Sequence, residues 1–356
     1  MLKKTYLVIV ALLSLHLIVP AQTVTLQGNL IGLTENQLQF VYNTSEGYKV
    51  DTIHVTDGKF TWSKKLSGPR KAMLFLPENS FPFFIEPGNI RIEGRPDSVV
   101  VIGSKTYDES IAYSRSFKDL QLQRDSIRKA ISNAPANEQP ALREKQLQVT
   151  KMWTERENAY IKSNPMHVIS SDIAARRASM GDYDEALLAF NLLGKTIQES
   201  PEGKEIASAL AIGKRSRMGA KVPDFIQNDP EGRPVNFASF RGKYVFIDFW
   251  SSSCAPCRAE NPNILKAYNK YKGKNFTVLG VSLDDDIELW KNAIKEDKMP
   301  WTMVSDLKGL KNEISSYFGI FGIPRSLLID AEGKIIAKDL RGDELKQKLD
   351  ELFSSN

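Results

Sequence analysis

The chain of 356 residues has only two cysteines, Cys254 and Cys257, and two residues separate them. An apolar run typical of a buried strand precedes them, and a run with helical periodicity follows. At a helix N-terminus this spacing allows a small disulfide ring, with the first thiol in the exposed first turn. Because free N–H groups and the positive end of the helix dipole favour a thiolate, we expect the pKa of Cys254 to lie below that of a free cysteine. Cys254 is the predicted nucleophile and Cys257 the predicted resolving thiol.

Two other uses of such a pair are half of a zinc site and a structural disulfide. Structural zinc needs two further ligands, but there is no third cysteine, and the three histidines, His16, His54 and His167, lie in separate segments. A structural disulfide closing so short a loop would restrain little chain entropy. We therefore expect redox chemistry with no metal and with no cofactor other than the Cys254–Cys257 disulfide.

One carboxylate, Asp248, interrupts the apolar run at 243–250. Burying a carboxylate among apolar side chains costs free energy and raises its pKa. Such a group could accept the proton that Cys257 must lose when it resolves a mixed disulfide. The alternative is an aspartate at a strand edge that faces water.

A second signal is the sequence Gly-Ile-Pro at 322–324, just before another apolar run, where Pro324 suggests a special turn such as a cis peptide. Asp-Phe-Trp-x3-Cys-x2-Cys followed by a distant Gly-Ile-Pro resembles the thioredoxin fold. More closely, residues 218–356 are similar to the TlpA/ResA-like thiol:disulfide oxidoreductases of bacterial envelopes. The similarity includes Pro223-Asp224-Phe225, Gly242-Lys243, Val281-Ser282-Leu283-Asp284 and Leu328-Ile329-Asp330-Ala331-Glu332-Gly333-Lys334.

The resemblance implies a role for each matching residue. Cys254 would be the attacking thiol and Cys257 the resolving thiol, with Pro324 as a cis-proline facing them. The backbone of Ile323 would pair with an extended substrate segment. Glu260 matches an acidic position that would tune the thiol pKa and line a substrate cavity; the alternative is an ordinary first-turn glutamate that favours the helix dipole.

The residues next to the thiols complete the predicted site. Trp250 and Pro256 are assigned to substrate binding, and Pro256 also stiffens the turn between the cysteines. The chain departs from its relatives at Ser253, where they commonly carry tryptophan, which predicts a less apolar recognition surface. It departs again at Asp248, where many relatives have an uncharged residue, so resolution is expected to follow thioredoxin more than ResA.

The first residues have the layout of a signal peptide over 1–21. Met1-Leu2-Lys3-Lys4 is basic, an apolar stretch follows, and Pro20-Ala21 precedes Gln22. We expect cleavage after Ala21 and export to the periplasm or cell envelope; an anchor that is kept uncleaved is the alternative. No cysteine follows the apolar stretch, so lipid anchoring is not expected.

Length and composition predict several domains. Residues 22–104 alternate polar and apolar positions between turns such as Asp57-Gly58, which predicts a small β-sandwich. This part resembles the β domain of unassigned function that precedes thioredoxin domains in Bacteroidetes envelope proteins. Residues 105–217 have helical periodicity and form a helical region and linker, and 218–356 form the α/β thioredoxin-like domain. The net charge of +5 is modest and not gathered in one stripe, so nucleic acid is not an expected partner.

The predicted function is periplasmic reduction of disulfides in exported proteins, with apocytochromes during cytochrome c maturation as one candidate substrate. Electrons would come from a membrane thiol relay, and apolar helix faces in the middle region could support a homodimer. One alternative is a thiol peroxidase of the peroxiredoxin type, because Ser251-Ser252-Ser253-Cys254 resembles its motif, although Ile247 stands where that motif has proline. The other is an envelope binding or scaffold protein with a non-essential disulfide.

Overall fold

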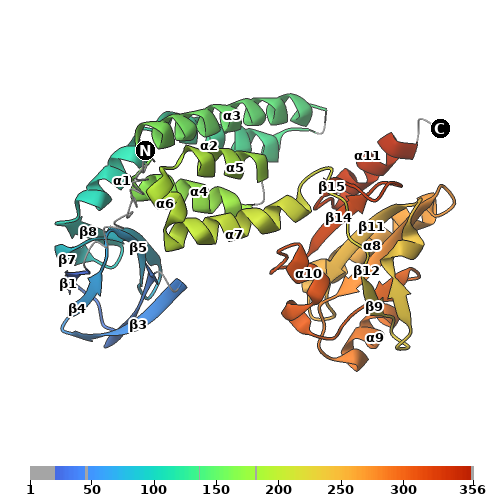
Figure 1. The fold of residues 1–356 in the computed structure, drawn as a ribbon, viewed down its shortest axis with the longest axis horizontal. Coiled ribbons are helices and arrows are strands. Elements are labelled where there is room, and N and C mark those ends of the chain that lie inside the picture. The colour runs from blue at the N-terminus through green and yellow to red at the C-terminus, as the bar shows by residue number, and fades with distance from the viewer. Residues whose placement is uncertain (1–20, 45–46, 136, 181–182, 354–356) are drawn as a thin grey trace, which may run out of the picture. The chain divides into compact units, whose positions relative to one another are not determined.

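The computed structural model describes residues 21–44, 47–135, 137–180 and 183–353 (Figure 1). The chain forms two compact units that divide between Glu157 and Asn158. Apart from Ala21, the predicted signal peptide lies outside the described residues. Within those residues, no helix combines the length and the apolar character that crossing a membrane requires.

The first unit begins with an all-β part, which confirms the predicted class of this region. Buried and exposed side chains alternate along its strands, so the sheet buries one face. The strand order is β6-β5-β2-β3-β4-β1-β7-β8, in which β1 and β7 are parallel and the other neighbours antiparallel. The strands are β1 (Gln22–Leu30), β2 (Gln37–Thr44), β3 (Gly47–Thr56), β4 (Lys59–Leu66), β5 (Arg70–Phe75), β6 (Ser80–Ile85), β7 (Gly88–Arg95) and β8 (Ser98–Ile102).

Strand β3 makes this sheet curl around one core. It pairs with β2 along its length but with β4 only through Val55 and Thr56. Buried side chains from each of the eight strands form a single cluster, so the expected sandwich-like packing takes the form of one barrel-like sheet. Asp57 and Gly58 join β3 to β4 with φ of 50° and 73°, the positive values that a tight hairpin turn requires.

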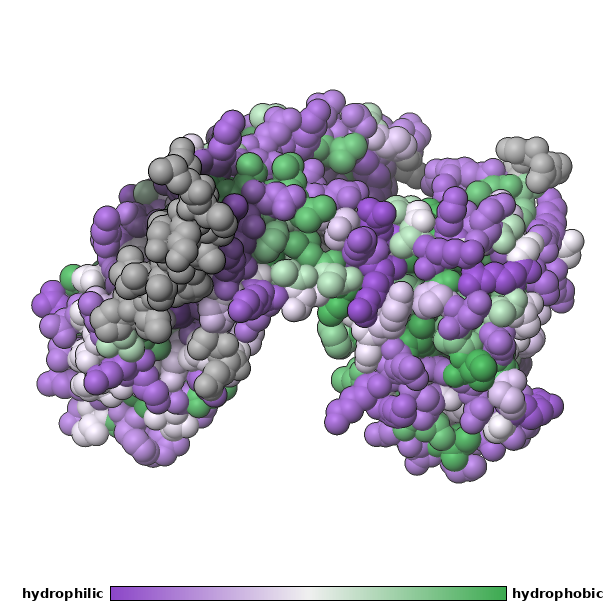
Figure 2. All heavy atoms as spheres, in the orientation of Figure 1, coloured by the Kyte–Doolittle hydropathy of each residue, from purple (hydrophilic) through white to green (hydrophobic). Residues whose placement is uncertain are grey.

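Helices follow directly on the sheet. Ser104 caps the first of them, because its Oγ accepts a hydrogen bond from the backbone N–H of Tyr107 at 3.1 Å. The surface of α2 and α3 seen in Figure 2 is mostly hydrophilic, as expected for helices in contact with water. These helices are α1 (Lys105–Arg115), α2 (Lys118–Asn133) and α3 (Gln139–Ser163), and α3 continues into the second unit.

The second unit contains four more helices before its sheet. Ser200 caps the longest of them, α7, and Pro201 occupies its first turn, where a missing N–H costs nothing. Together with α1, α2 and α3 they make up the predicted helical middle region. They are α4 (Val168–Met180), α5 (Tyr183–Leu192), α6 (Lys195–Glu199) and α7 (Pro201–Ser216).

The rest of the second unit has the predicted thioredoxin-like α/β fold. A five-stranded sheet in the order β13-β12-β11-β14-β15 has β11, β12 and β13 parallel and β14 antiparallel to both of its neighbours. Two clusters of buried side chains cover its two faces, one with α8, α9 and α11 and the other with η1 and α10. The strands are β9 (Ile226–Asn228), β10 (Pro234–Asn236), β11 (Tyr244–Trp250), β12 (Phe276–Ser282), β13 (Thr302–Val304), β14 (Arg325–Ile329) and β15 (Ile335–Lys338). The helices are η1 (Phe237–Phe240), α8 (Ala255–Tyr271), α9 (Ile287–Glu296), η2 (Gly309–Lys311), α10 (Glu313–Tyr317) and α11 (Gly342–Phe353).

Both edges of the five-stranded sheet meet another part of the same chain. Beside β15, the N–H of Gly219 donates to the carbonyl of Ile335 at 2.8 Å, and the N–H of Ile335 donates to the carbonyl of Ala220 at 2.9 Å. At the other edge, β13 has only three residues, and the N–H of Ser305 directly after it donates to the carbonyl of Asn228 at 3.0 Å.

Candidate active site

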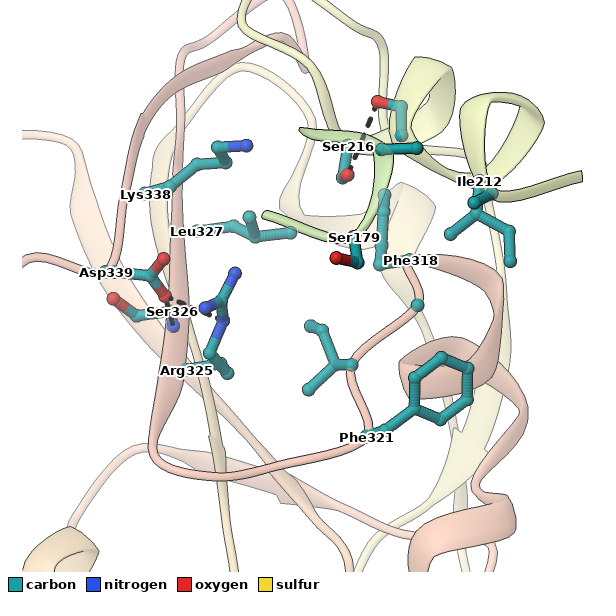
Figure 3. Close-up of a pocket in the computed structure, with 15 residues that line it drawn as sticks. Ser179, Ile212, Ser216, Phe318, Phe321, Arg325, Ser326, Leu327, Lys338 and Asp339 are labelled. Carbon is teal, nitrogen blue, oxygen red and sulfur yellow. Dashed lines mark hydrogen bonds and ion pairs between the residues drawn. The ribbon is translucent and has the colours of Figure 1, made fainter. Parts of the chain in front are cut away.

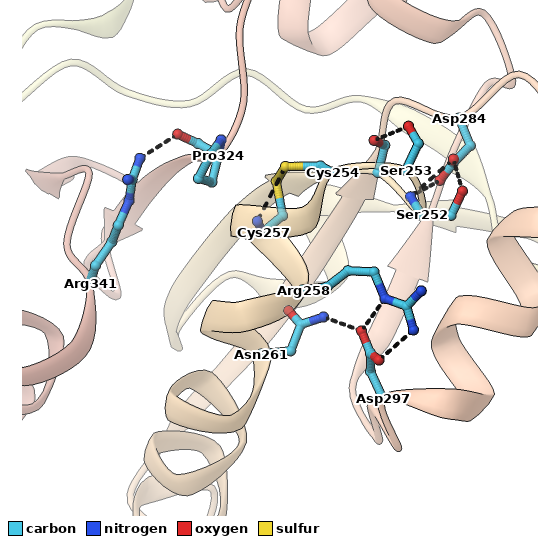
Figure 4. Close-up of a disulfide and its surroundings, with 11 residues drawn as sticks. Ser252, Ser253, Cys254, Cys257, Arg258, Asn261, Asp284, Asp297, Pro324 and Arg341 are labelled. Carbon is cyan, nitrogen blue, oxygen red and sulfur yellow. Dashed lines mark hydrogen bonds and ion pairs between the residues drawn. A yellow bond between two sulfur atoms is a disulfide. The ribbon is translucent and has the colours of Figure 1, made fainter.

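Strand β11 and helix α8 position the two cysteines. Cys254 is the N-cap of α8, and its Sγ accepts a hydrogen bond from the backbone N–H of Cys257 at 3.2 Å. The two residues form a disulfide with their Cα atoms 5.3 Å apart (Figure 4). Cys254 is half-buried, whereas only 2% of Cys257 is exposed. A substrate can therefore reach the first sulfur, and the second lies behind it in the core.

The loop at 321–324 forms the other side of the site. The peptide bond between Ile323 and Pro324 is cis, as predicted. Ile323 and Cys254 both pack against the buried cluster that contains Cys257, so the loop and the disulfide share one patch of core. Pro256 is exposed in the first turn of α8. The structure thus brings together five of the predicted site residues, and their roles in binding and exchange stay predictions.

Trp250 is not on the surface that a substrate would meet. Its side chain is fully buried, in the same cluster as Phe246 and Cys257. Trp250 is buried because successive side chains of a strand point to opposite faces of the sheet, so residues 246, 248 and 250 of β11 all point toward α8. Its sequence position just before the cysteine loop suggested contact with substrate, but the period of two along β11 decides its direction.

Asp248 lies on that same face of the central strand. Its neighbours in the sheet are Ser326 on β14 and Gly280 on β12, and only 7% of it is exposed. Its pKa is raised to about 7, first by burial and then by the negative charge of Glu260, while the positive charge of Arg341 acts in the opposite direction. The predicted burial and raised pKa are confirmed, and the alternative of a water-facing strand edge is excluded.

Glu260 holds the start of another helix. Its Oε1 accepts a hydrogen bond from the backbone N–H of Gly342, the first residue of α11, at 2.6 Å. Its Oε2 accepts one from the Nδ2 of Asn263 at 3.0 Å. Its charge acts on Asp248, and this link from Glu260 to α11 was not expected from the sequence.

Sequence reasoning missed Asp284, which fixes the serine loop before Cys254. One of its carboxylate oxygens accepts a hydrogen bond from the Oγ of Ser252 at 2.6 Å, and the backbone N–H of Ser252 donates to both oxygens at 3.0 and 3.1 Å. The Oγ of Ser282 donates to the same carboxylate at 2.7 Å. Figure 4 shows the bonds between Ser252 and Asp284 near the disulfide. The motif that contains Asp284 was recognised, but nothing local in it pointed to a contact 32 residues away.

Arg258, next to Cys257 in α8, was also missed. Its guanidinium makes two hydrogen bonds of 3.0 and 2.7 Å to the carboxylate of Asp297 and one of 2.7 Å to Glu296. The Nδ2 of Asn261 donates to Asp297 as well, at 2.8 Å. These contacts tie the helix that carries the thiols to the end of α9.

A pocket of about 260 Å³ borders β14 on the side of α7 (Figure 3). Phe321 and Arg325 line it, and these residues lie in the chain on either side of the cis peptide. Neither cysteine lines it, so the exchange reaction belongs to the disulfide face and not to this pocket.

Comparison with known proteins identifies the family. Residues 218–338 match the AhpC/TSA family, and residues 24–110 match a domain of unknown function (DUF4369). Over 138 residues the chain is 32% identical to the thiol-disulfide oxidoreductase ResA of Bacillus thuringiensis subsp. konkukian, covering 39% of this chain and 78% of the relative. The chain belongs to the ResA-like thiol-disulfide oxidoreductases. This confirms the resemblance drawn from the sequence, including the β domain of unassigned function.

Two of the solved structures similar to this ResA-like enzyme come from Bacteroides species. The thioredoxin domain of a thiol-disulfide oxidoreductase from Bacteroides vulgatus is 42% identical, with 38% of this chain and 97% of that chain covered and a TM-score of 0.37. The C-terminal domain of a thiol-disulfide oxidoreductase from Bacteroides thetaiotaomicron, described as putative, is 35% identical, with 40% and 99% covered and a TM-score of 0.38.

In this ResA-like oxidoreductase, replacing Asp284 by alanine is expected to lower the free energy of unfolding by about 2 kcal/mol, because the buried hydroxyl of Ser282 and the half-buried N–H and hydroxyl of Ser252 lose a charged acceptor. Urea unfolding of the oxidised protein measures this. Asp285→Ala is the matched control, because this neighbouring aspartate is exposed. Equal midpoints for the two variants would show that the Asp284 contacts contribute nothing.

Proposed function

We propose that this ResA-like oxidoreductase works as a reductase of disulfides in exported proteins. The observation that carries the proposal is the unequal burial of the two cysteines, together with a buried carboxyl, that of Asp248, whose pKa is about 7 on the strand face that α8 covers. We expect a large substrate to reach the half-buried Cys254, whereas Cys257 is enclosed in the core and reacts with its partner.

The reaction follows from this arrangement. In the reduced enzyme the Cys254 thiolate attacks one sulfur of the substrate disulfide, and the other substrate sulfur leaves as a thiolate and takes up a proton. Cys257 gives its proton to the carboxylate of Asp248 and attacks the Sγ of Cys254. The bond between Cys254 and the substrate breaks, and the second substrate sulfur leaves as a thiolate and takes up a proton. The substrate departs with two thiols, and the enzyme is left with the Cys254–Cys257 disulfide.

Two electrons and two protons must then return to the enzyme. We propose that a membrane thiol relay supplies them. We place the enzyme in the periplasm or cell envelope, because residues 1–21 have the layout of a signal peptide. Apocytochromes awaiting haem are a candidate substrate, and the apolar faces of the middle helices are a candidate dimer contact. Fractionation of cells and N-terminal sequencing test the compartment: a mature chain that begins at Gln22 supports it, and an uncleaved chain in the cytoplasm contradicts it.

The reduction potential of the Cys254–Cys257 pair tests the direction of electron flow. We expect a value near or below about −250 mV in titrations against dithiothreitol and glutathione buffers, as for thioredoxin-like reductases. A value above about −150 mV would make the protein an oxidant of exported thiols. The control is the Cys254→Ala variant, which forms no intramolecular disulfide and should give no redox transition.

The match to the AhpC/TSA family favours one second candidate, a thiol peroxidase. In that case Cys254 would be oxidised to a sulfenic acid by peroxide, and Cys257 would condense with it to the same disulfide. Consumption of hydrogen peroxide by the purified, reduced protein distinguishes the two functions. Catalytic consumption that requires Cys254 supports the peroxidase, and its absence leaves the reductase.

A further inference from the structure

Arg341, directly before α11, and Gly342, the first residue of α11, connect the two sides of the active site. The Nη2 of Arg341 donates a hydrogen bond to the carbonyl oxygen of Pro324 at 2.6 Å. The backbone N–H of the next residue, Gly342, donates to Glu260 on α8 at 2.6 Å. Pro324 belongs to the cis-proline loop, and α8 carries both cysteines. Figure 4 shows the side chain of Arg341 reaching the carbonyl of Pro324.

This connection is anchored in the core. The carbonyl of Arg341 accepts hydrogen bonds from the N–H groups of Glu344 and Leu345, so Arg341 begins the helix that follows it. Leu345 and Leu349 are buried in the same cluster as Cys257. A shift of Arg341 would therefore disturb packing around the resolving cysteine, and the loop is held against a fixed support.

The same connection places one positive and one negative charge near Asp248. Arg341 at the start of α11 lowers the pKa of this carboxyl, and Glu260 on α8 raises it. The neighbours of Asp248 on the adjoining strands, Ser326 and Gly280, carry no charge. Removing the guanidinium of Arg341 is therefore expected to raise the pKa of Asp248 and favour its protonated form.

We propose that Arg341 is a positioning residue for disulfide exchange, which holds the cis-proline loop at a fixed distance from the helix that carries the thiols. The proposal rests on exchange at Cys254 and is independent of the direction of electron flow. Without the bond from Arg341, the carbonyl of Pro324 loses its partner and the backbone of Ile323 is less well placed to pair with an extended chain. A small disulfide needs no such pairing.

Steady-state kinetics with two substrates test this. For Arg341→Gln we expect the KM of a disulfide-bonded peptide to rise about tenfold, the cost of one charge-assisted hydrogen bond, and the KM of hydroxyethyl disulfide to change less than about twofold. The pH midpoint of the resolution step should move upward, because the positive charge that lowers the pKa of Asp248 is gone. Lys346→Gln is the matched control, because it removes one exposed positive charge from α11. In this variant the KM values of both substrates should stay unchanged.

A second variant separates the hydrogen bond from the charge. Arg341→Lys keeps the positive charge but has no planar fork, so the pH midpoint should stay near that of the native enzyme while the peptide KM rises. If Arg341→Gln does not fold, Arg341→Lys decides the question by its KM ratio alone. Equal changes in KM for both substrates, or no change in either, would overturn the proposal. If the enzyme proves to be an oxidant, the same ratio is measured with the dithiol peptide, so failure of the reductase function does not affect the test.

Discussion

Replacing Cys257 by alanine is expected to leave Cys254 covalently joined to its protein substrates. Attack on a substrate disulfide needs only the thiol of Cys254. Release of the substrate needs the second thiol, that of Cys257, of which only 2% is exposed. The variant therefore completes the first half of the reaction and stops. In cells that express it, non-reducing gels should show higher bands that disappear after treatment with dithiothreitol.

The Cys254→Ala variant should show the opposite behaviour. Without the attacking thiolate, we expect the rate of peptide disulfide reduction to fall about 1000-fold or more. No mixed disulfide should form, because Cys257 is shielded by the core and by the first turn of α8. The double variant, in which both Cys254 and Cys257 are replaced by alanine, controls for substrate proteins that bind without a covalent bond. Equal trapping by the Cys254→Ala and Cys257→Ala variants would contradict the assigned order of the two thiols, and no trapping by Cys257→Ala would contradict protein disulfides as substrates.

The second large effect is expected at Asp248, where an asparagine should make the enzyme more stable and slower. In the folded protein the pKa of Asp248 is about 7, above its ordinary value of 3.8, so the folded state holds this proton more tightly than the unfolded chain does. The native enzyme therefore loses stability as the pH rises from about 4 to about 7, and the loss is complete above that range. The uncharged amide avoids this cost, which amounts to as much as about 4 kcal/mol.

The same replacement that raises stability is expected to lower the rate of the resolution step. Above pH 7 the carboxylate of Asp248 is ionised and can take the proton of Cys257, so the resolution rate of the native enzyme should rise through this pH. In Asp248→Asn that rise should be absent, and the rate at pH 8 should fall about 100-fold, the lower end of typical general-base effects. Stopped-flow measurement of thiol release from a preformed mixed disulfide gives the rate, and urea unfolding of the oxidised form from pH 4 to 8 gives the stability.

A control keeps these two results apart. Asp285→Asn removes a carboxylate that is exposed, so neither its stability curve nor its rate profile should differ from the native enzyme. If Asp248→Asn keeps the native pH profile, another group accepts the proton. If its stability advantage does not grow between pH 4 and pH 7, the carboxyl is not held at the raised pKa.

The sequence was most informative where the signal was local. The spacing of Cys254 and Cys257, the apolar neighbours of Asp248 and the proline after Ile323 each lie within a few residues, and each predicted a feature that the structure has. Trp250 lies in the same stretch, but which way its side chain points depends on the strand period and on which face α8 covers.

The residues that hold the site together could not be found this way. Arg341 bonds to a residue 17 positions away, and Asp284 to one 32 positions away. An arginine at a helix start and an aspartate after a strand are both common, so neither residue stands out until the strand order places it beside the loop. The curled sheet of the first unit is a similar case. The alternation of polar and apolar residues predicts that β2, β3 and β4 are strands, but it does not show that β3 pairs with both of the others.

Under the proposed function the enzyme would meet unfolded chains and could be trapped by them, because the free backbone groups of a sheet edge attract any extended strand. Here Gly219 and Ala220 already occupy groups beside β15, and Asn228 meets the chain just after the short strand β13. We expect a substrate chain to find few places for prolonged attachment along the edges of this sheet and to be held by the bond to sulfur and by the contact at the cis-proline loop. Contact then lasts as long as the mixed disulfide does, which favours rapid turnover over chaperone-like retention.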